Sequence, residues 1–141
     1  MSQENITYHL SDMNAIACTI VKKLQKKTIL LFQGDLGAGK TTLSKLIVKN
    51  LGGNDKDVTS PTFNLIHKYN AGKQCIWHID LYRIKSVDAL INLGIEDLIQ
   101  EGIVIVEWGE MMKCHFINRC LEVSLTFTDI INTRKIKLRY V

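Results

Sequence analysis

The amino-acid sequence predicts one α/β domain over residues 1–141, with a mostly parallel central sheet, antiparallel additions and flanking helices. Short apolar runs of the kind that is buried on both faces of a parallel sheet occur at residues 28–33 and 103–106. Segments whose apolar residues recur at helical spacing alternate with these runs. With 46% hydrophobic residues and no repeat or linker, the chain is expected to fold around its own core.

Local signals delimit the helices. Ser11 or Asp12 is placed to cap a first helix, whose apolar residues recur at helical spacing. The pair Gly52-Gly53 ends a second helix, and Gly94 separates two short ones. Helices are therefore expected at residues 13–24, about 40–51, 87–93 and 95–99.

Strands are expected between these helices, and residues 69–73 are typical of a hairpin turn that joins two of them. The last two strands are predicted to form a closing antiparallel pair around a turn near residues 132–133. The expected strands are residues 6–10, 28–33, 63–69, 74–79, 103–106, 120–127 and 136–141.

The strongest functional signal is the segment GDLGAGKT at residues 34–41, which matches the pattern G-x-x-x-x-G-K-[ST] at every fixed position. It lies between an expected strand and an expected helix, as a phosphate-binding P-loop requires. Glycine backbones can turn successive N–H groups into one concavity, and the helix N-terminus adds a positive dipole end. The sequence therefore predicts a nucleoside triphosphate site.

Each residue of this loop has an expected role. Backbone groups of Gly37, Ala38 and Gly39 surround the phosphates. Lys40 reaches the β- and γ-phosphates as a mobile point charge, Thr41 places its hydroxyl on Mg²⁺, and the next hydroxyl, Thr42, contacts an inner phosphate. ATP and Mg²⁺ are the expected ligands.

Two carboxylates are candidates for the metal and the attacking water. Asp80 follows the expected strand at residues 74–79, and Glu107 follows the one at 103–106. If the sheet is parallel there, both strands carry their carboxylates to the same edge as the P-loop, where Mg²⁺ stabilises acids at low exposure. The alternative is a carboxylate that caps a strand end or pairs with Arg83.

The segment SPTF at residues 60–63 contains the only proline of the chain, directly before Thr62. Proline stiffens the segment and presents Thr62 in a defined direction, as in a switch that senses the γ-phosphate and Mg²⁺. An ordinary turn that enters a strand is the alternative.

Composition limits the partners and the compartment. The net charge is +4, and the scattered basic pairs suggest an acidic partner or RNA, with a solvated helix face as the simpler explanation. No apolar run is long enough for a membrane helix and no leader is evident, so a cytoplasmic protein with no membrane or DNA partner is expected. The four cysteines are expected to be free thiols; Cys114, His115 and Cys120 form at most a partial metal site.

Four motifs together resemble, in order and spacing, those of the bacterial TsaE (YjeE) family, and the match spans nearly the whole chain. They are GDLGAGKTT at residues 34–42, SPTF at 60–63, HIDLYR at 78–83 and EWGE at 107–110. The resemblance implies a small P-loop ATPase required for threonylcarbamoyladenosine modification at position 37 of tRNAs. It also implies action on a TsaB–TsaD complex, which ATP hydrolysis resets, and contact with tRNA only through that complex.

The resemblance also implies roles for individual residues. The phosphate ligands would be Lys40 and Thr42, the metal ligands Thr41, Asp80 and Glu107, the switch residue Thr62, and the catalytic residues Lys40, Asp80 and Glu107. Trp108 would close over the site or its partner surface, with core packing at a strand end as the alternative. Arg134 would lie near the nucleotide. His78 would be either catalytic by proximity or a structural histidine.

Other functions have weaker support. A GTPase would need a guanine-reading N-K-x-D, and the nearest string, NDKD at residues 54–57, has the wrong order. A small-molecule P-loop kinase would need an arginine-bearing lid, for which the chain is short. An ATP-gated docking module with incidental hydrolysis stays open. Because no arginine finger is evident, slow hydrolysis by the isolated chain, with a partner that completes the site, is expected.

Overall fold

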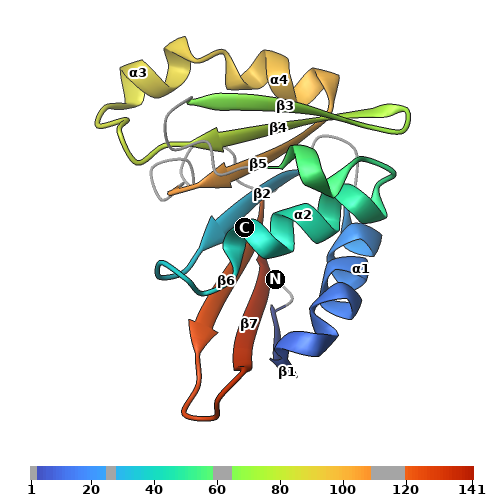
Figure 1. The fold of residues 1–141 in the computed structure, drawn as a ribbon. Helices are drawn as coiled ribbons and strands as arrows, with labels where there is room; N and C mark the ends of the chain where they lie inside the picture. The colour runs from blue at the N-terminus through green and yellow to red at the C-terminus, as the bar shows by residue number, and fades with distance from the viewer. Residues whose placement is uncertain (1–2, 25–27, 59–64, 109–119) are drawn as a thin grey trace.

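The computed structural model of the chain describes residues 3–24, 28–58, 65–108 and 120–141, which form one seven-stranded sheet with helices on both faces (Figure 1). The helices are α1 (Met13–Lys23), α2 (Lys40–Asn50), α3 (Val87–Asn92) and α4 (Ile95–Glu101), with 3-10 turns at Leu10–Asp12 and Asp55–Asp57. The strands are β1 (Gln3–His9), β2 (Ile29–Gln33), β3 (Ile66–Ala71), β4 (Gln74–Asp80), β5 (Ile103–Glu107), β6 (Cys120–Phe127) and β7 (Thr133–Tyr140). None of the helices described is long and apolar enough to cross a membrane.

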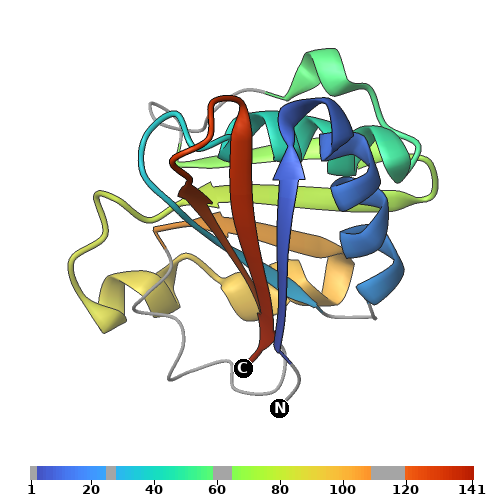
Figure 2. The same cartoon turned by 90° about the horizontal axis from the view of Figure 1, so that it is seen from below.

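The sheet is parallel in its centre and antiparallel at its two ends, which confirms the predicted fold class. The strand order is β1-β7-β6-β2-β5-β4-β3. Parallel pairing joins β6 to β2, β2 to β5, and β5 to β4. Strand β3 joins β4 antiparallel through the predicted hairpin, and β7 lies antiparallel between β6 and β1. Figure 2 shows β1, β6 and β7 side by side at one end of the sheet.

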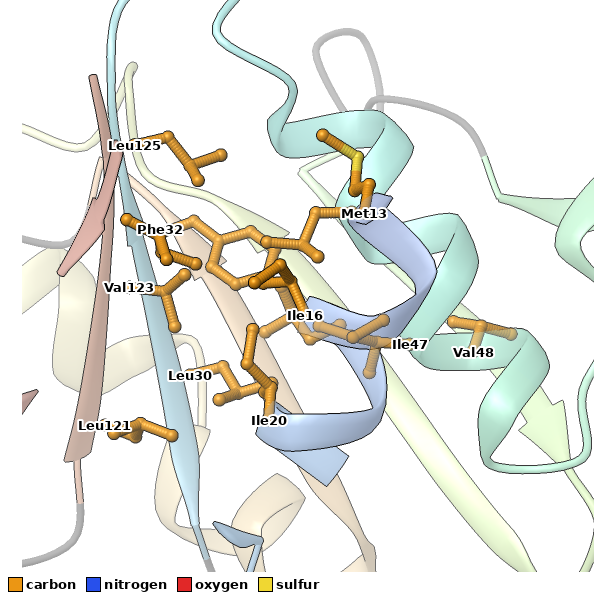
Figure 3. Packing of buried hydrophobic residues seen from close by; sticks show 14 of the residues in the cluster. Met13, Ile16, Ile20, Leu30, Phe32, Ile47, Val48, Leu121, Val123 and Leu125 are labelled. Carbon is orange, nitrogen blue, oxygen red and sulfur yellow. The ribbon is translucent and has the colours of Figure 1, made fainter. Parts of the chain in front are cut away.

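Side chains alternate along the buried strands and so divide the core between two faces. Leu30 and Phe32 of β2 belong to the larger cluster, which α1 and α2 cover. Figure 3 shows Ile16 and Ile20 of α1 and Ile47 of α2 directed toward this face. The intervening residues of β2 belong to a second cluster, which includes Ile95 and Ile99 of α4 on the opposite face. Burial on both faces explains why β2 and β5 read as continuous apolar runs.

The start of α1 differs from the prediction. A 3-10 turn, Leu10–Asp12, precedes the helix, and His9 Nδ1 accepts a hydrogen bond from the Ser11 N–H at 3.1 Å. Asp12 lies at φ −98° and ψ 8° and makes no capping hydrogen bond, because its backbone is not in the extended conformation of a side-chain cap. His9 therefore organises this helix entry, and capping of α1 by Ser11 or Asp12 is wrong.

Other boundaries shift by a few residues. Strand β1 starts at Gln3 and β7 at Thr133, so both antiparallel end strands are longer than predicted. Residues 63–64 of the predicted 63–69 strand lie outside the described residues, and β3 runs from Ile66 to Ala71. Cys18, Cys75 and Cys120 carry thiols rather than disulfide bonds, as predicted. Cys114 and His115 lie outside the described residues.

Gly102 is needed where β5 starts beside β4, because a Cβ there would collide with the backbone carbonyl of Cys75. Gly102→Ala is therefore expected to lower the free energy of unfolding by at least about 2 kcal/mol. Gly72→Ala is the control. An alanine at its left-handed φ of +61° costs about 1 kcal/mol, but the added Cβ would lie 3.5 Å from its nearest neighbour, the Leu51 carbonyl oxygen, which is an ordinary contact. Urea denaturation followed by circular dichroism measures both. A smaller loss for Gly102→Ala than for Gly72→Ala would contradict the packing argument.

Candidate functional site

The P-loop forms a tight turn between β2 and α2 because its glycines adopt conformations closed to other residues. Gly34, Gly37 and Gly39 have φ values of +147°, +82° and +115°. A Cβ on Gly34 would lie 2.7 Å from the Leu125 carbonyl oxygen, so the loop leaves β2 in close contact with β6. Gly39 is the N-cap residue of α2 and has no side chain that could cap this helix end. The N-terminal N–H groups and dipole of an eleven-residue helix are thus directed at the loop.

A cavity of about 490 Å³ lies at this helix end. It brings together most of the predicted site residues from the P-loop, β4 and β5. Its lining consists of Leu36, Gly37, Gly39, Lys40, Thr41, Thr42, Asp80, Tyr82, Glu107 and Trp108. Ala38 of the same loop is buried in the core, 1% exposed, and does not line the cavity. Tyr82 and Leu36 were given no role from the sequence, although Tyr82 is part of the HIDLYR segment.

The two carboxylates lie at the carboxyl ends of neighbouring parallel strands. Asp80 of β4 and Glu107 of β5 are register partners, and Phe32 at the end of β2 pairs with Glu107 in turn. This parallel arrangement is the condition under which both acids reach the edge of the sheet that carries the P-loop. Both are buried, 8% and 4% exposed, and both line the cavity.

Each carboxylate is held by a specific hydrogen bond. Asp80 Oδ1 accepts from the Tyr82 backbone N–H at 2.9 Å. Glu107 Oε2 accepts from His78 Nε2 at 3.1 Å, in a pair whose histidine is completely buried. Among the described residues neither acid pairs with Arg83, so the proposed alternative of an Arg83 ion pair has no support. In the described part of the chain, the second oxygen of each carboxylate makes no hydrogen bond.

The oxygens at this site fit a magnesium–nucleotide complex better than a protein-held metal centre. Thr41, Asp80 and Glu107, which carry a hydroxyl and two carboxylates, line one cavity, and oxygen ligands of these kinds suit Mg²⁺. Within the part of the chain that the structure describes, no group of three or more His, Cys, Asp or Glu side chains could hold a metal ion alone. Mg²⁺ is commonly bound through one or two carboxylates together with substrate phosphates, so the donor set is compatible with that mode.

Trp108 follows β5 and adopts a left-handed backbone, with φ of +60°. Its indole is 45% exposed and lines the cavity, so it does not pack in the core at the strand end. The Lys40 ammonium lies 4.9 Å from the centre of the indole ring, a cation–π distance, and the Tyr82 ring stands edge-on to it at 5.1 Å. The P-loop lysine is therefore in contact with Trp108 in this structure.

Besides Ala38, one predicted ligand among the described residues, Arg134, is not part of this lining. Arg134 lies at the start of β7, with its guanidinium 4.4 Å from the Phe127 ring centre and Nη1 donating to the Thr133 carbonyl at 3.1 Å. It is not among the residues that surround the cavity. Thr62 and the rest of the SPTF segment lie outside the described residues.

The chain is similar to proteins of one family in sequence and in fold. The family profile described as "Threonylcarbamoyl adenosine biosynthesis protein TsaE" matches residues 7–136. The tRNA threonylcarbamoyladenosine biosynthesis protein TsaE of Rickettsia felis is 36% identical over 114 residues, covering 81% of this chain and 67% of that protein. The protein of the same name from Rickettsia prowazekii is 38% identical over 108 residues, covering 77% and 75%. The crystal structure of YdiB from Bacillus subtilis matches with a TM-score of 0.73 and 25% identity, covering 97% of this chain and 84% of the other.

Nucleotide binding is expected to change the fluorescence of Trp108, because Lys40 must leave the indole ring to reach a phosphate. The chain has two tryptophans, and the other, Trp77 on β4, does not line the cavity. Titration of ATP into the wild-type protein should therefore alter the emission, whereas the Trp108→Phe variant, which reports Trp77 alone, should show no change. An unchanged wild-type signal, with binding verified by calorimetry, would contradict the expected movement of Lys40.

Proposed function

The chain belongs to the TsaE family, which acts in tRNA threonylcarbamoyladenosine biosynthesis, and we propose that it serves this pathway as a Mg²⁺-dependent ATPase. Family and P-loop fold support ATPase activity in general. The single observation that supports the specific proposal is the cavity in which the P-loop, Asp80 and Glu107 meet. ATP is the proposed substrate, and hydrolysis is proposed to drive or reset a TsaB–TsaD heterodimer.

In phosphoryl transfer, the residues of the cavity bind the phosphates and neutralise their charge. Backbone N–H groups of the P-loop and the α2 N-terminus hold the phosphates. Lys40 exchanges its contact with Trp108 for the β- and γ-phosphates, and Thr42 contacts an inner phosphate. When bound, Mg²⁺ would neutralise phosphate charge and polarise the bond to the leaving group. Phosphoryl transfer depends almost entirely on such positioning and electrostatic stabilisation.

Strand order suggests how the carboxylates divide their roles. Strand β5 adjoins β2, whereas β4 lies one strand further from the P-loop. We therefore assign Glu107, with Thr41, to the metal, and Asp80 to the orientation of the attacking water. The hydrogen bond from the Tyr82 backbone to Asp80 Oδ1 leaves Oδ2 available for that water.

Partner proteins are proposed to complete the site. Among the described residues, Lys40 is the only cationic side chain that lines the cavity, and no arginine faces it. An arginine supplied by a partner accelerates hydrolysis in other P-loop enzymes. The TsaB–TsaD heterodimer is the proposed partner, and tRNA is proposed to interact only through it. Neither a kinase nor a docking module with incidental hydrolysis is favoured by the family assignment.

Phosphate release from ATP should be slow for the purified chain and faster when TsaB and TsaD are added. Lys40→Ala is the blank, because it removes the only cation of the described lining and should abolish the stimulated rate. Fast turnover by the chain alone would refute the need for a partner. Binding of the partners without stimulation would favour a docking module, and phosphate transfer to a metabolite would favour a kinase.

The two carboxylates should be separable by isosteric amides. Glu107→Gln is expected to weaken Mg²⁺ binding to the nucleotide complex, so that excess Mg²⁺ partly restores hydrolysis. Asp80→Asn is expected to keep Mg²⁺ affinity and lose about 10²–10⁴-fold in kcat, the range of a general base. Calorimetry of Mg²⁺ binding and steady-state rates across Mg²⁺ concentrations measure both effects. The reverse pattern would exchange the two assignments, and tRNA modification supported by both variants would argue against a role for hydrolysis.

A further inference from the structure

A buried chain of hydrogen bonds lies behind Glu107 and is not used by the proposed mechanism. His78 of β4 is 0% exposed, and its Nε2 is 3.1 Å from Glu107 Oε2. On the other side of the ring, His78 Nδ1 is 3.3 Å from the Tyr69 hydroxyl. Tyr69 belongs to β3, at the edge of the sheet, and is 5% exposed. Side chains of three adjacent strands are therefore linked, from β3 through β4 to β5.

The chemistry of these groups fixes the direction of the hydrogen bonds. An ionised carboxylate only accepts, so His78 Nε2 must carry the proton that it shares with Glu107. In the neutral imidazole, Nδ1 is then an acceptor, and the Tyr69 hydroxyl donates to it. Tyr69 thus favours the one neutral tautomer that can hold Glu107. The Tyr69 oxygen is also 3.4 Å from Nδ1 of His67, which lies on the same strand.

Because Glu107 is buried, its hydrogen bond with His78 matters for the position of its carboxylate. Its side chain is 6% exposed, so water cannot easily replace the histidine at Oε2. Glutamate has several rotatable bonds, and the hydrogen bond to Oε2 restrains the carboxylate of a residue that lines the cavity. Groups that hydrogen-bond a ligating carboxylate commonly set its orientation and basicity.

We propose that His78 is a positioning residue for the reaction, and that Tyr69 holds the His78 ring in the tautomer that orients Glu107. The inference rests on the proposed function, because it assigns Glu107 to the metal-binding side of the site. His78 acts through Glu107 and touches neither substrate nor metal. A histidine that only fills the core would leave the geometry of Glu107 unaffected when its donor is removed.

Three variants separate positioning from packing. Tyr69→Phe removes one hydroxyl and keeps the ring. His78→Leu removes both nitrogens, whereas His78→Gln keeps an amide N–H that can reach Glu107. Tyr8→Phe is the matched control: Tyr8 is also 5% exposed, and its hydroxyl has no partner among the described residues. Thermal melting shows whether each variant is folded, and Tyr69→Phe serves as the decisive variant if His78→Leu is not.

The first readout needs no activity. Long-range proton–nitrogen NMR of the protein labelled with nitrogen-15 histidine should show His78 protonated at Nε2 in the wild type. Its Nδ1 resonance should shift in Tyr69→Phe and stay unchanged in Tyr8→Phe. Protonation at Nδ1 in the neutral wild-type ring, or equal spectra for wild type and Tyr69→Phe, would overturn the proposal.

The second readout is the split between kcat and KM in ATP hydrolysis with TsaB and TsaD. His78→Leu should lower kcat about 10–100-fold, as loss of a supporting partner does at other metal sites, with KM for ATP unchanged. Tyr69→Phe should show a smaller loss and His78→Gln a partial rescue. Equal kcat for Tyr69→Phe and Tyr8→Phe, or no difference between His78→Gln and His78→Leu, would overturn positioning.

The two proposals can fail separately. If the wild-type chain with its partners hydrolyses no ATP, the proposed function fails. The positioning of Glu107 is then decided by NMR and by Mg²⁺ affinity in the presence of a non-hydrolysable ATP analogue. That affinity should fall in His78→Leu and be partly restored in His78→Gln. Equal Mg²⁺ affinity in the wild type and both variants would overturn the inference about His78.

Discussion

The site depends on the parallel pairing of β2, β5 and β4. Parallel strands end at the same edge, so this pairing places the P-loop beside Glu107 and Asp80, although these lie far apart in the chain. The pairing in turn needs helices on both faces, because each central strand is apolar on both sides. The P-loop helix α2 therefore has two functions: its apolar side covers the sheet, and its N-terminus faces the cavity.

Burying two carboxylates at one edge is unfavourable unless each is hydrogen-bonded, and the structure meets this requirement in different ways. Asp80 receives a backbone N–H from the residue two positions later, which needs only a local turn. Glu107 receives a side-chain donor from the neighbouring strand, which needs the register of β4 against β5. The Lys40 ammonium meanwhile contacts the indole of Trp108. Each of these three charged side chains thus has a contact within the protein, and phosphate must compete with Trp108 for Lys40.

Features that depend on local sequence could be predicted, whereas features that depend on register or backbone direction could not. The P-loop is one continuous stretch of sequence. Asp80 and Glu107 each come directly after an apolar run, so a parallel sheet was enough to predict that they lie at the same edge. The bond between His78 and Glu107 joins residues 29 positions apart and required the three-dimensional pairing of β4 with β5. The left-handed backbone of Trp108 could not be predicted, because the residue at that position is not a glycine. His9 was missed as the helix-entry residue because an extra 3-10 turn precedes α1.

The charge balance of the cavity explains why we expect this small domain to need a partner for fast hydrolysis. Its described lining supplies one cation, Lys40, and two carboxylates, Asp80 and Glu107, so it is net negative before a triphosphate enters. Helix dipole and loop N–H groups offset only part of that charge, since a helix terminus is equivalent to about half a unit charge. A divalent cation reverses the sign locally, which is consistent with two acids at a phosphate site. Charge that develops during bond cleavage would still face no arginine of the described lining, so an arginine would have to come from outside that lining.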